Sequence, residues 1–261
     1  MSKSKYKHII LTAVFLFTFA GIGTAKEASE TKGAMPGHEL HWGYEGEGDP
    51  EHWGDIKKEF ELCKKGLNQS PINITDDSKA KTEPLELNYK ESPLKIVNNG
   101  HTIQVNYAPG SFLKIGNSQY QLLQFHFHTP SEHLIKGKAY EMEVHFVHVN
   151  DKGQLAVVVG IFMKPGENNP LVKKIWAYLP KEVNKEEERA NIAINVKDLL
   201  PKDTAYYNYL GSLTIPPCSE GVNWFVMKTP IEVSKDQISV FRNQIKLNAR
   251  PPQPINKRTV K

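Results

Sequence analysis

The segment that most constrains the fold is Gln124 to His133, Gln-Phe-His-Phe-His-Thr-Pro-Ser-Glu-His. Successive side chains of a β-strand point to opposite faces, so His126 and His128 share one face and the two phenylalanines share the other. Residues 139–149 have the composition of a second strand, and the gap at 134–138 contains a glycine. This pattern predicts a hairpin, which would bring His145 opposite the first two histidines.

Three imidazoles that converge in this way predict a metal site. Three neutral ligands with a free fourth position are typical of a catalytic zinc site, because a closed shell leaves no room for a reactive water. Ten histidines in 261 residues will produce some chance His-x-His pairs. However, Gln124 and Glu143 lie two residues before His126 and His145, on the same strand faces, where they can accept the second N–H of each ring. These polar neighbours favour the metal interpretation.

The N-terminus predicts an exported protein. Residues 1–25 have the three parts of a signal peptide, namely three lysines, an apolar core at 9–22 and a small-residue cleavage site. The alternative is an uncleaved anchor, although the apolar run is short for a membrane span. Residues 26–36 are predicted to be a flexible lead, and residues 37–261 a single domain. We therefore expect a secreted or periplasmic protein with no membrane partner after cleavage.

The net charge of the chain argues against a nucleic-acid partner. The chain has 33 Lys+Arg and 29 Asp+Glu, and residues 1–25 hold three of the lysines and no acid. Removing them leaves the mature chain nearly neutral, so no basic face for nucleic acid is expected. About 236 residues then remain, which is enough for one domain with a substantial core.

The two cysteines, Cys63 and Cys218, can form only one intramolecular pair. A disulfide in an exported chain would close a loop of about 155 residues, and its stabilisation would be roughly 5 kcal/mol at most. Zinc ligation is the alternative use, but neither cysteine belongs to a C-x-x-C motif.

The remaining pattern predicts one sheet with a few short helices. Helices are expected after Asp49-Pro50, from Asn169-Pro170 to Pro180, and after Ser234, which forms a capping box with Gln237. The charged run 181–189 is predicted to be a solvated face or a loop. Short β-type runs occur near 85–89, 94–97, 102–107, 112–115, 119–128 and 155–162.

Together these residues resemble the α-class carbonic anhydrases of the exported bacterial type, zinc enzymes that interconvert carbon dioxide and bicarbonate. The resemblance implies a mainly β single domain, built on a twisted, mostly antiparallel sheet of about ten strands with short peripheral helices. It also implies the disulfide between the two cysteines and is compatible with a homodimer. The matching motifs cover the mature chain in order: His41-Trp-Gly-Tyr44, Gln69-Ser-Pro-Ile72, Asn98-Asn-Gly-His101, Gln124 to His133, Glu143-Val-His145, Gly211-Ser-Leu-Thr-Ile-Pro-Pro217 and Asn248-Ala-Arg-Pro251.

The resemblance also implies a role for each site residue. Zn²⁺ would be held by the three histidines, with Gln124, Glu143 and the carbonyl of Asn248 as their hydrogen-bond partners. Zinc-bound hydroxide would attack carbon dioxide, oriented by Thr214 and Glu132, and His101 would be the proton shuttle. Tyr44, Asn99 and Gln104 would hold the water between them. The apolar wall for carbon dioxide would consist of Val147, Val158, Leu213, Val222 and Trp224.

The sequence departs from the family pattern at two positions, and two other interpretations of the chain stay open. Ile215 stands where many members of this family carry a hydroxyl residue, which predicts altered bicarbonate or anion affinity, and Gln104 keeps an amide on a longer arm. His126-x-His128-x-x-x-Glu132 also fits the first metal motif of cupins, but no histidine follows for their second motif. The other alternative is a binding module of the same fold without activity. His133 is predicted to support the site, and His148 to lie on the face away from the metal.

Overall fold

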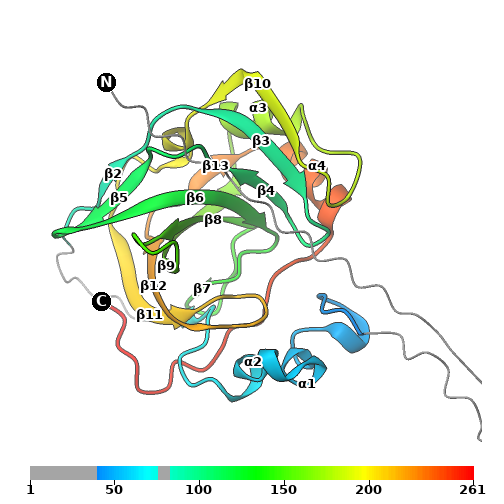
Figure 1. The fold of residues 1–261 in the computed structure, drawn as a ribbon, viewed down its shortest axis with the longest axis vertical. Coiled ribbons are helices and arrows are strands. Elements are labelled where there is room, and N and C mark those ends of the chain that lie inside the picture. Colours follow the sequence, from blue (N-terminus) through cyan, green and yellow to red (C-terminus); the bar gives the residue numbers. More distant parts are fainter. Residues whose placement is uncertain (1–39, 76–82) are drawn as a thin grey trace, which may run out of the picture. The chain divides into compact units, whose positions relative to one another are not determined.

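The computed structural model describes residues 40–75 and 83–261 (Figure 1). The predicted signal peptide and lead lie outside these residues. The described chain begins with short helical turns and then enters a large sheet. The first turns are η1 (Gly46–Gly48), α1 (Trp53–Ile56), η2 (Lys58–Phe60) and α2 (Leu62–Lys65).

The main sheet has eleven strands within the described residues. Its central path runs β10-β3-β4-β6-β8-β9-β12-β11, with β5 paired to β6 and to β2, and with β13 paired to β9 (Figure 1). Most pairs are antiparallel, but β9 pairs in parallel with β12 and β13, so the sheet is mixed. The mainly β prediction is confirmed. The strands are β2 (Glu86–Asn88), β3 (Ser92–Asn98), β4 (Ile103–Asn106), β5 (Phe112–Ile115), β6 (Ser118–His128), β8 (Met142–Val149), β9 (Leu155–Pro165), β10 (Glu187–Ile194), β11 (Tyr206–Ser212), β12 (Glu220–Met227) and β13 (Ile231–Val233).

The predicted pairing of the two histidine strands is confirmed. β6 and β8 are antiparallel neighbours, with His126 directly opposite His145. Phe125 and Phe127 point to the other face, where they join the larger hydrophobic core. Between these strands in sequence lies β7 (Leu134–Ile135), which pairs with β1 (Asn73–Ile74) in a separate small sheet. Every residue of β8 is buried, so both faces of the sheet are covered at this point.

Two helices cover the phenylalanine face. α3 (Pro170–Trp176) begins as predicted, because the side chain of Asn169 accepts hydrogen bonds from the first-turn amides. α4 (Lys235–Ile245) has the predicted capping box between Ser234 and Gln237. Trp176 and Phe241 both pack against Phe127, which fixes the helices on this side of the histidine strand.

Two boundaries were predicted wrongly at the ends of helices. α1 begins at Trp53, not at Pro50, because the carboxylate of Asp49 accepts from Glu51 N and so closes a turn before the helix. α3 ends at Trp176, before Pro180.

The charged run 181–189, expected to be a solvated face or a loop, is a solvated strand in its last part. Residues from Glu187 onward form β10, an edge strand paired with β3. Main-chain pairing sets this strand, and charged side chains on an edge strand discourage contact with other sheets.

The disulfide between Cys63 and Cys218 is present, with an S–S distance of 2.08 Å. It ties α2 to the loop between β11 and β12, which contains Thr214 and Ile215. Among the described residues, no helix has the length and apolar character that crossing a bilayer requires.

Candidate metal centre

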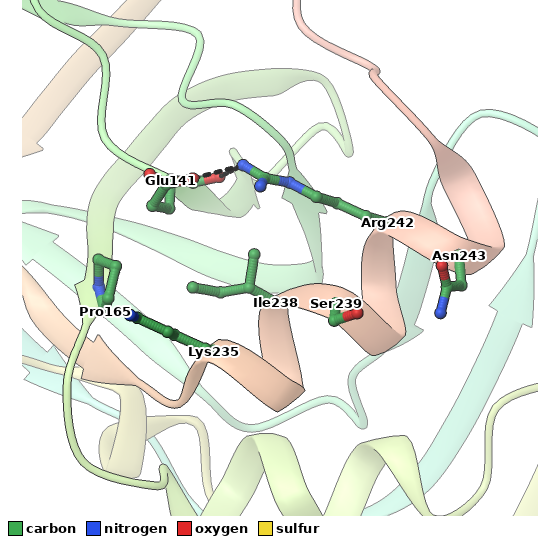
Figure 2. A pocket seen from close by; sticks show the side chains of 7 residues that line it. All are labelled: Glu141, Pro165, Lys235, Ile238, Ser239, Arg242 and Asn243. Atoms are coloured by element: carbon green, nitrogen blue, oxygen red, sulfur yellow. Dashed lines mark hydrogen bonds and ion pairs between the residues drawn. The ribbon is translucent and has the colours of Figure 1, made fainter.

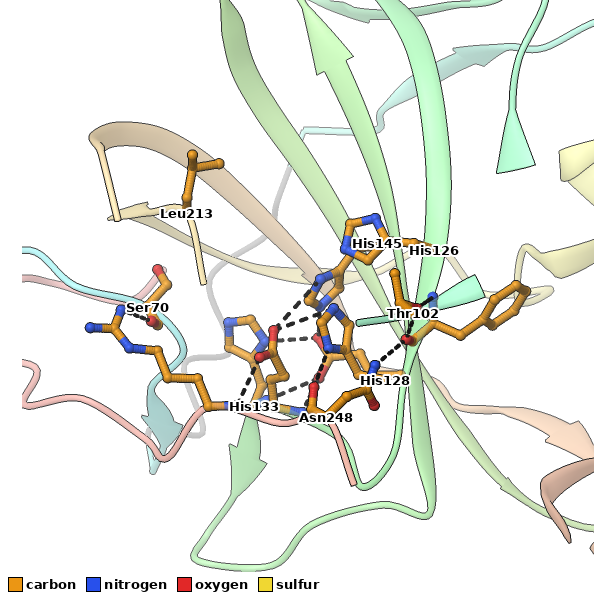
Figure 3. A network of polar contacts seen from close by, with 12 residues as sticks. Ser70, Thr102, His126, His128, His133, His145, Leu213 and Asn248 are labelled. Carbon is orange, nitrogen blue, oxygen red and sulfur yellow. Dashed lines mark hydrogen bonds and ion pairs between the residues drawn. The ribbon is translucent and has the colours of Figure 1, made fainter. Parts of the chain in front are cut away.

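The three predicted metal ligands meet on one face of the sheet. One ring nitrogen from each of His126, His128 and His145 lies within 4.8 Å of the other two. Figure 3 shows the three rings close together, with polar contacts running to their neighbours. His128 and His145 are buried, and His126 is partly buried.

A hydrogen bond to one nitrogen of each ring fixes which nitrogen remains free. His126 Nδ1 donates to Gln124 Oε1 at 2.9 Å, and His128 Nδ1 donates to the carbonyl of Asn248 at 2.8 Å. His145 Nε2 donates to Glu143 Oε1 at 2.8 Å. Since all three partners are acceptors, each neutral ring keeps its lone pair on the other nitrogen. The free nitrogens are Nε2, Nε2 and Nδ1, respectively, which is the tautomer pattern that metal binding requires.

Burial favours the neutral form of His126 and His128. It lowers the pKa of His126 well below the ordinary value of 6.5, and repulsion by the two neighbouring rings lowers it further. Burial also lowers the pKa of His128, although the nearby Glu132 opposes the shift. Neutral imidazoles at neutral pH are the form that can ligate a cation.

Two orphaned atoms show that the residues fit a cation. His128 Nε2 and Glu132 Oε2 are buried, and neither has a hydrogen-bond partner within the described chain. They lie 3.6 Å apart, and the same oxygen lies 3.8 Å from His145 Nδ1. No proton lies between these ring nitrogens and the carboxylate oxygen. Their lone pairs therefore face one another and repel in a buried site. A dication would relieve this repulsion and use the free nitrogens.

A second group of potential ligands, His133, Glu143 and His145, is also compact. Both nitrogens of His133 are already engaged, however, because Nδ1 lies 2.8 Å from Glu143 Oε1 and Nε2 lies 2.7 Å from Tyr209 OH. The other carboxylate oxygen of Glu143 accepts from the backbone amides of Glu132 and His133. His133 therefore supports the carboxylate that orients His145, as predicted.

Asn248 connects two parts of the site. Its carbonyl orients His128, and its side-chain nitrogen donates to the backbone carbonyl of His101 at 3.0 Å. Its side-chain oxygen accepts from Thr129 N at 2.7 Å. Only the carbonyl role was expected from the sequence.

An apolar cavity of about 140 Å³ opens beside the metal centre. Four of the five predicted wall residues line it, while Val222 does not line it but is buried in the same hydrophobic cluster as Trp224. Leu155 was not among the wall residues implied by the resemblance, and in an ideal strand its parity would place it on the other face from Val158. A register shift between β8 and β9 next to Val149 moves it to the cavity side. The lining residues are Gln124, His126, His145, Val147, Leu155, Val158, Leu213, Thr214, Ile215 and Trp224.

A smaller cavity of about 70 Å³ contains the residues expected to conduct the proton. His101 lies in it, stacked on Trp42 at 3.7 Å between ring centroids, and burial lowers the pKa of His101. Burial also raises the pKa of Tyr44, so its hydroxyl stays protonated. Ile215 lines both cavities. The residues of this cavity are Trp42, Tyr44, Asn99, His101, Thr102, Gln104, Gln124, His126, His128 and Ile215.

One expected contact is not made. Glu132 Oε1 accepts from Arg250 N at 2.9 Å, but Oε2 has no hydrogen-bond partner among the described residues, so the bond expected from Thr214 is not formed. Thr214 nevertheless lines the apolar cavity together with His126 and His145.

One further buried histidine and a larger surface cavity lie outside this centre. His148 is buried on the opposite face, 2.9 Å from Tyr89 OH, as its parity predicts. A surface cavity of about 450 Å³ lies along α4, where Arg242 pairs with Glu141 (Figure 2). It contains none of the predicted site residues.

Comparison with known proteins agrees with this geometry. Residues 48–261 match the model of the eukaryotic-type carbonic anhydrase family. A carbonic anhydrase of Pectobacterium carotovorum is 46% identical over 223 residues, which cover 85% of this chain and 90% of that protein. The Nostoc sp. carbonic anhydrase is 41% identical over 265 residues, or 100% and 98% of the two chains. The solved structure of the α-carbonic anhydrase from Thermovibrio ammonificans, in complex with sulfanilamide, has a TM-score of 0.81 at 44% identity and covers 84% and 98% of the two chains.

Proposed function

The chain belongs to the eukaryotic-type, or α-class, carbonic anhydrase family, whose general reaction is the hydration of carbon dioxide, and we propose that it performs this reaction with zinc and a histidine proton shuttle. The observation that carries the proposal is the convergence of three histidines whose hydrogen bonds leave three free nitrogens within 4.8 Å. His126, His128 and His145 would hold the ion. When bound, zinc would lower the pKa of a coordinated water to about 7, so that hydroxide would be available at neutral pH.

The protein supplies a separate place for the apolar substrate. Val147, Val158 and Trp224 line a cavity that also contains His145, so carbon dioxide held there lies next to the metal centre. An apolar wall suits this substrate because it has no charge and accepts hydrogen bonds only weakly. Thr214, on the rim of the same cavity, would orient the attacking oxygen once its own hydroxyl donates to Glu132.

Proton removal is the second task of the site. His101 lies in the smaller cavity that also contains His126 and His128, and Tyr44, Asn99 and Gln104 offer hydrogen-bonding groups to the same cavity. An imidazole whose pKa lies at or below 6.5 releases protons readily to a neutral solution. We assign His101 the shuttle role for this reason.

The disulfide supports export. Disulfides persist in oxidising compartments, and Cys63–Cys218 fits the predicted signal peptide, so we propose a secreted or periplasmic location.

The proposal is tested by metal analysis and by stopped-flow hydration of carbon dioxide. The purified chain is expected to contain one zinc ion, to lose activity with chelation and to regain it when zinc is added. A catalytically silent binding module would show no hydration at any zinc concentration. A cupin-like metal centre would instead retain iron or manganese.

A further inference from the structure

Three polar side chains connect the cavity beside His101 with the protein surface. Gln104, on β4, lines the cavity, and its Nε2 donates to Asn106 Oδ1 at 2.7 Å. Asn106 Nδ2 in turn donates to a carboxylate oxygen of Glu186, which is exposed to solvent. A surface carboxylate is thus linked to the wall of the proposed proton path.

The fold holds Glu186 at this place. The residue immediately precedes β10, which pairs with β3, and β3 pairs with β4. Just before it, Asn184 N donates to Asn98 O at 2.7 Å, and Val183 bridges to Asn98. The segment that carries Glu186 is therefore fixed against the turn that leads to His101.

The carboxylate sets the direction of each hydrogen bond in this series. An ionised carboxylate only accepts, so Asn106 must present its Nδ2 to Glu186. Asn106 Oδ1 then faces Gln104, which must donate through Nε2. The Oε1 of Gln104 is left as the group that this side chain offers to the cavity.

The two amides could not fix this direction by themselves. A half-turn of the terminal amide exchanges its oxygen and nitrogen, and two paired amides form an equivalent bond in either sense. A third partner that only accepts removes this ambiguity. Glu186 is the partner of this kind that Asn106 has among the described residues.

We propose that Glu186 is a positioning residue for proton transfer, which acts through Asn106 to turn the carbonyl oxygen of Gln104 toward the cavity. There the oxygen accepts a hydrogen bond from the water that lies between the metal centre and His101. This inference rests on the proton path proposed above. With the amide reversed, Gln104 would donate to that water and hold it in the wrong orientation to pass a proton onward.

The test is stopped-flow hydration by the zinc-loaded full chain at low buffer concentration and with increasing imidazole. Glu186→Leu is expected to lower kcat about threefold at low buffer, because proton release then limits turnover. The carbon dioxide step does not use Gln104, so kcat/KM should be unchanged. Imidazole carries the proton itself and should restore kcat. Glu182→Leu removes an exposed charge from the same segment and should behave like the parent.

A second variant tests the orientation directly. In Asn106→Asp the new carboxylate accepts from Gln104 without help, so the double variant Asn106→Asp/Glu186→Leu should regain the parental kcat. The inference is overturned if Glu186→Leu has the parental kcat at low buffer, if kcat/KM falls together with kcat, or if the double variant is not rescued.

His101→Ala separates this inference from the proton path. If that variant shows the parental kcat and buffer dependence, the proposed shuttle itself is wrong. If it loses kcat while Glu186→Leu does not, only the role of Glu186 is lost.

Discussion

His133 and Glu143 are joined by a hydrogen bond of 2.8 Å between Nδ1 and Oε1, and the same carboxylate oxygen accepts from His145 Nε2. The far side of His133 contacts Tyr209 OH, which donates to Ser70 Oγ at 2.8 Å. A buried series of side chains therefore fixes the carboxylate that orients His145, one of the three proposed metal ligands.

This arrangement predicts that Glu143→Gln weakens zinc binding. The carboxylate accepts four hydrogen bonds, two from histidine rings and two from backbone amides. A glutamine keeps only one acceptor oxygen, and its NH₂ group would face donors. We expect the zinc Kd to rise about 10- to 100-fold, as measured by chelator competition. Glu141→Gln, an exposed neighbour paired with Arg242, is the matched control. An unchanged Kd in Glu143→Gln would show that the carboxylate does not orient the ligand.

His148 predicts a dependence of stability on pH. Burial lowers its pKa from 6.5 to about 3, so the unfolded chain binds this proton more readily than the folded chain does. The stabilisation is complete above the unfolded pKa of 6.5 and is lost as the pH falls toward 3, at about 1.4 kcal/mol per pH unit.

Urea unfolding at pH 6 and pH 5 measures this effect in the parent and in His148→Gln, both zinc-loaded. The glutamine cannot titrate but can still bond to Tyr89, and contributions from the metal centre cancel in the comparison. Between pH 6 and pH 5, the free energy of unfolding of the parent should fall by about 1 kcal/mol more than that of the variant. Equal losses of stability in the parent and in His148→Gln would show that a group other than His148 titrates.

Ile215 predicts weak binding of anions. It lines both the apolar cavity and the smaller cavity beside His101, where an alkyl side chain offers no hydrogen bond to bicarbonate or to an inhibitory anion. Ile215→Thr should tighten anion inhibition about fivefold, in keeping with one net hydrogen bond of about 1 kcal/mol. Ile215→Val has nearly the shape of threonine without the hydroxyl, so it controls for size. If inhibition constants and turnover are identical in parent and Ile215→Thr, this residue does not set anion affinity.

The disulfide predicts a combined loss of stability and activity. Cys218 closes the loop that carries Thr214, because Cys218 N donates to Ile215 O at 2.9 Å and the sulfur is tied to Cys63. The double variant Cys63→Ala/Cys218→Ala should lower the free energy of unfolding by about 3–5 kcal/mol. It should also lower kcat, because Thr214 loses its fixed position. Denaturant unfolding and hydration assays measure both. Stability equal to that of the parent, under oxidising conditions, would contradict the structural role.

The strand period was sufficient to predict that His126, His128 and His145 lie together. Alternation placed His126 and His128 on one face, and it placed Gln124 and Glu143 beside their ligands. The contact between His133 and Tyr209 spans 76 residues, so no local pattern contains it.

Other features depend on the backbone of neighbouring strands. Leu155 reaches the cavity through a register shift, and the charged start of β10 becomes a strand only by pairing with β3. The roles of Glu186 and Asn106 depend on the same pairing, because it brings together side chains that are 80 residues apart.

A crystal structure of the zinc-loaded protein, with the ion located by anomalous scattering, tests the central claim most directly. We predict one zinc ion about 2.0–2.1 Å from His126 Nε2, His128 Nε2 and His145 Nδ1, with no fourth protein ligand. An ion bound instead by His133 and Glu143, or a fourth position filled by Glu132, would contradict the account.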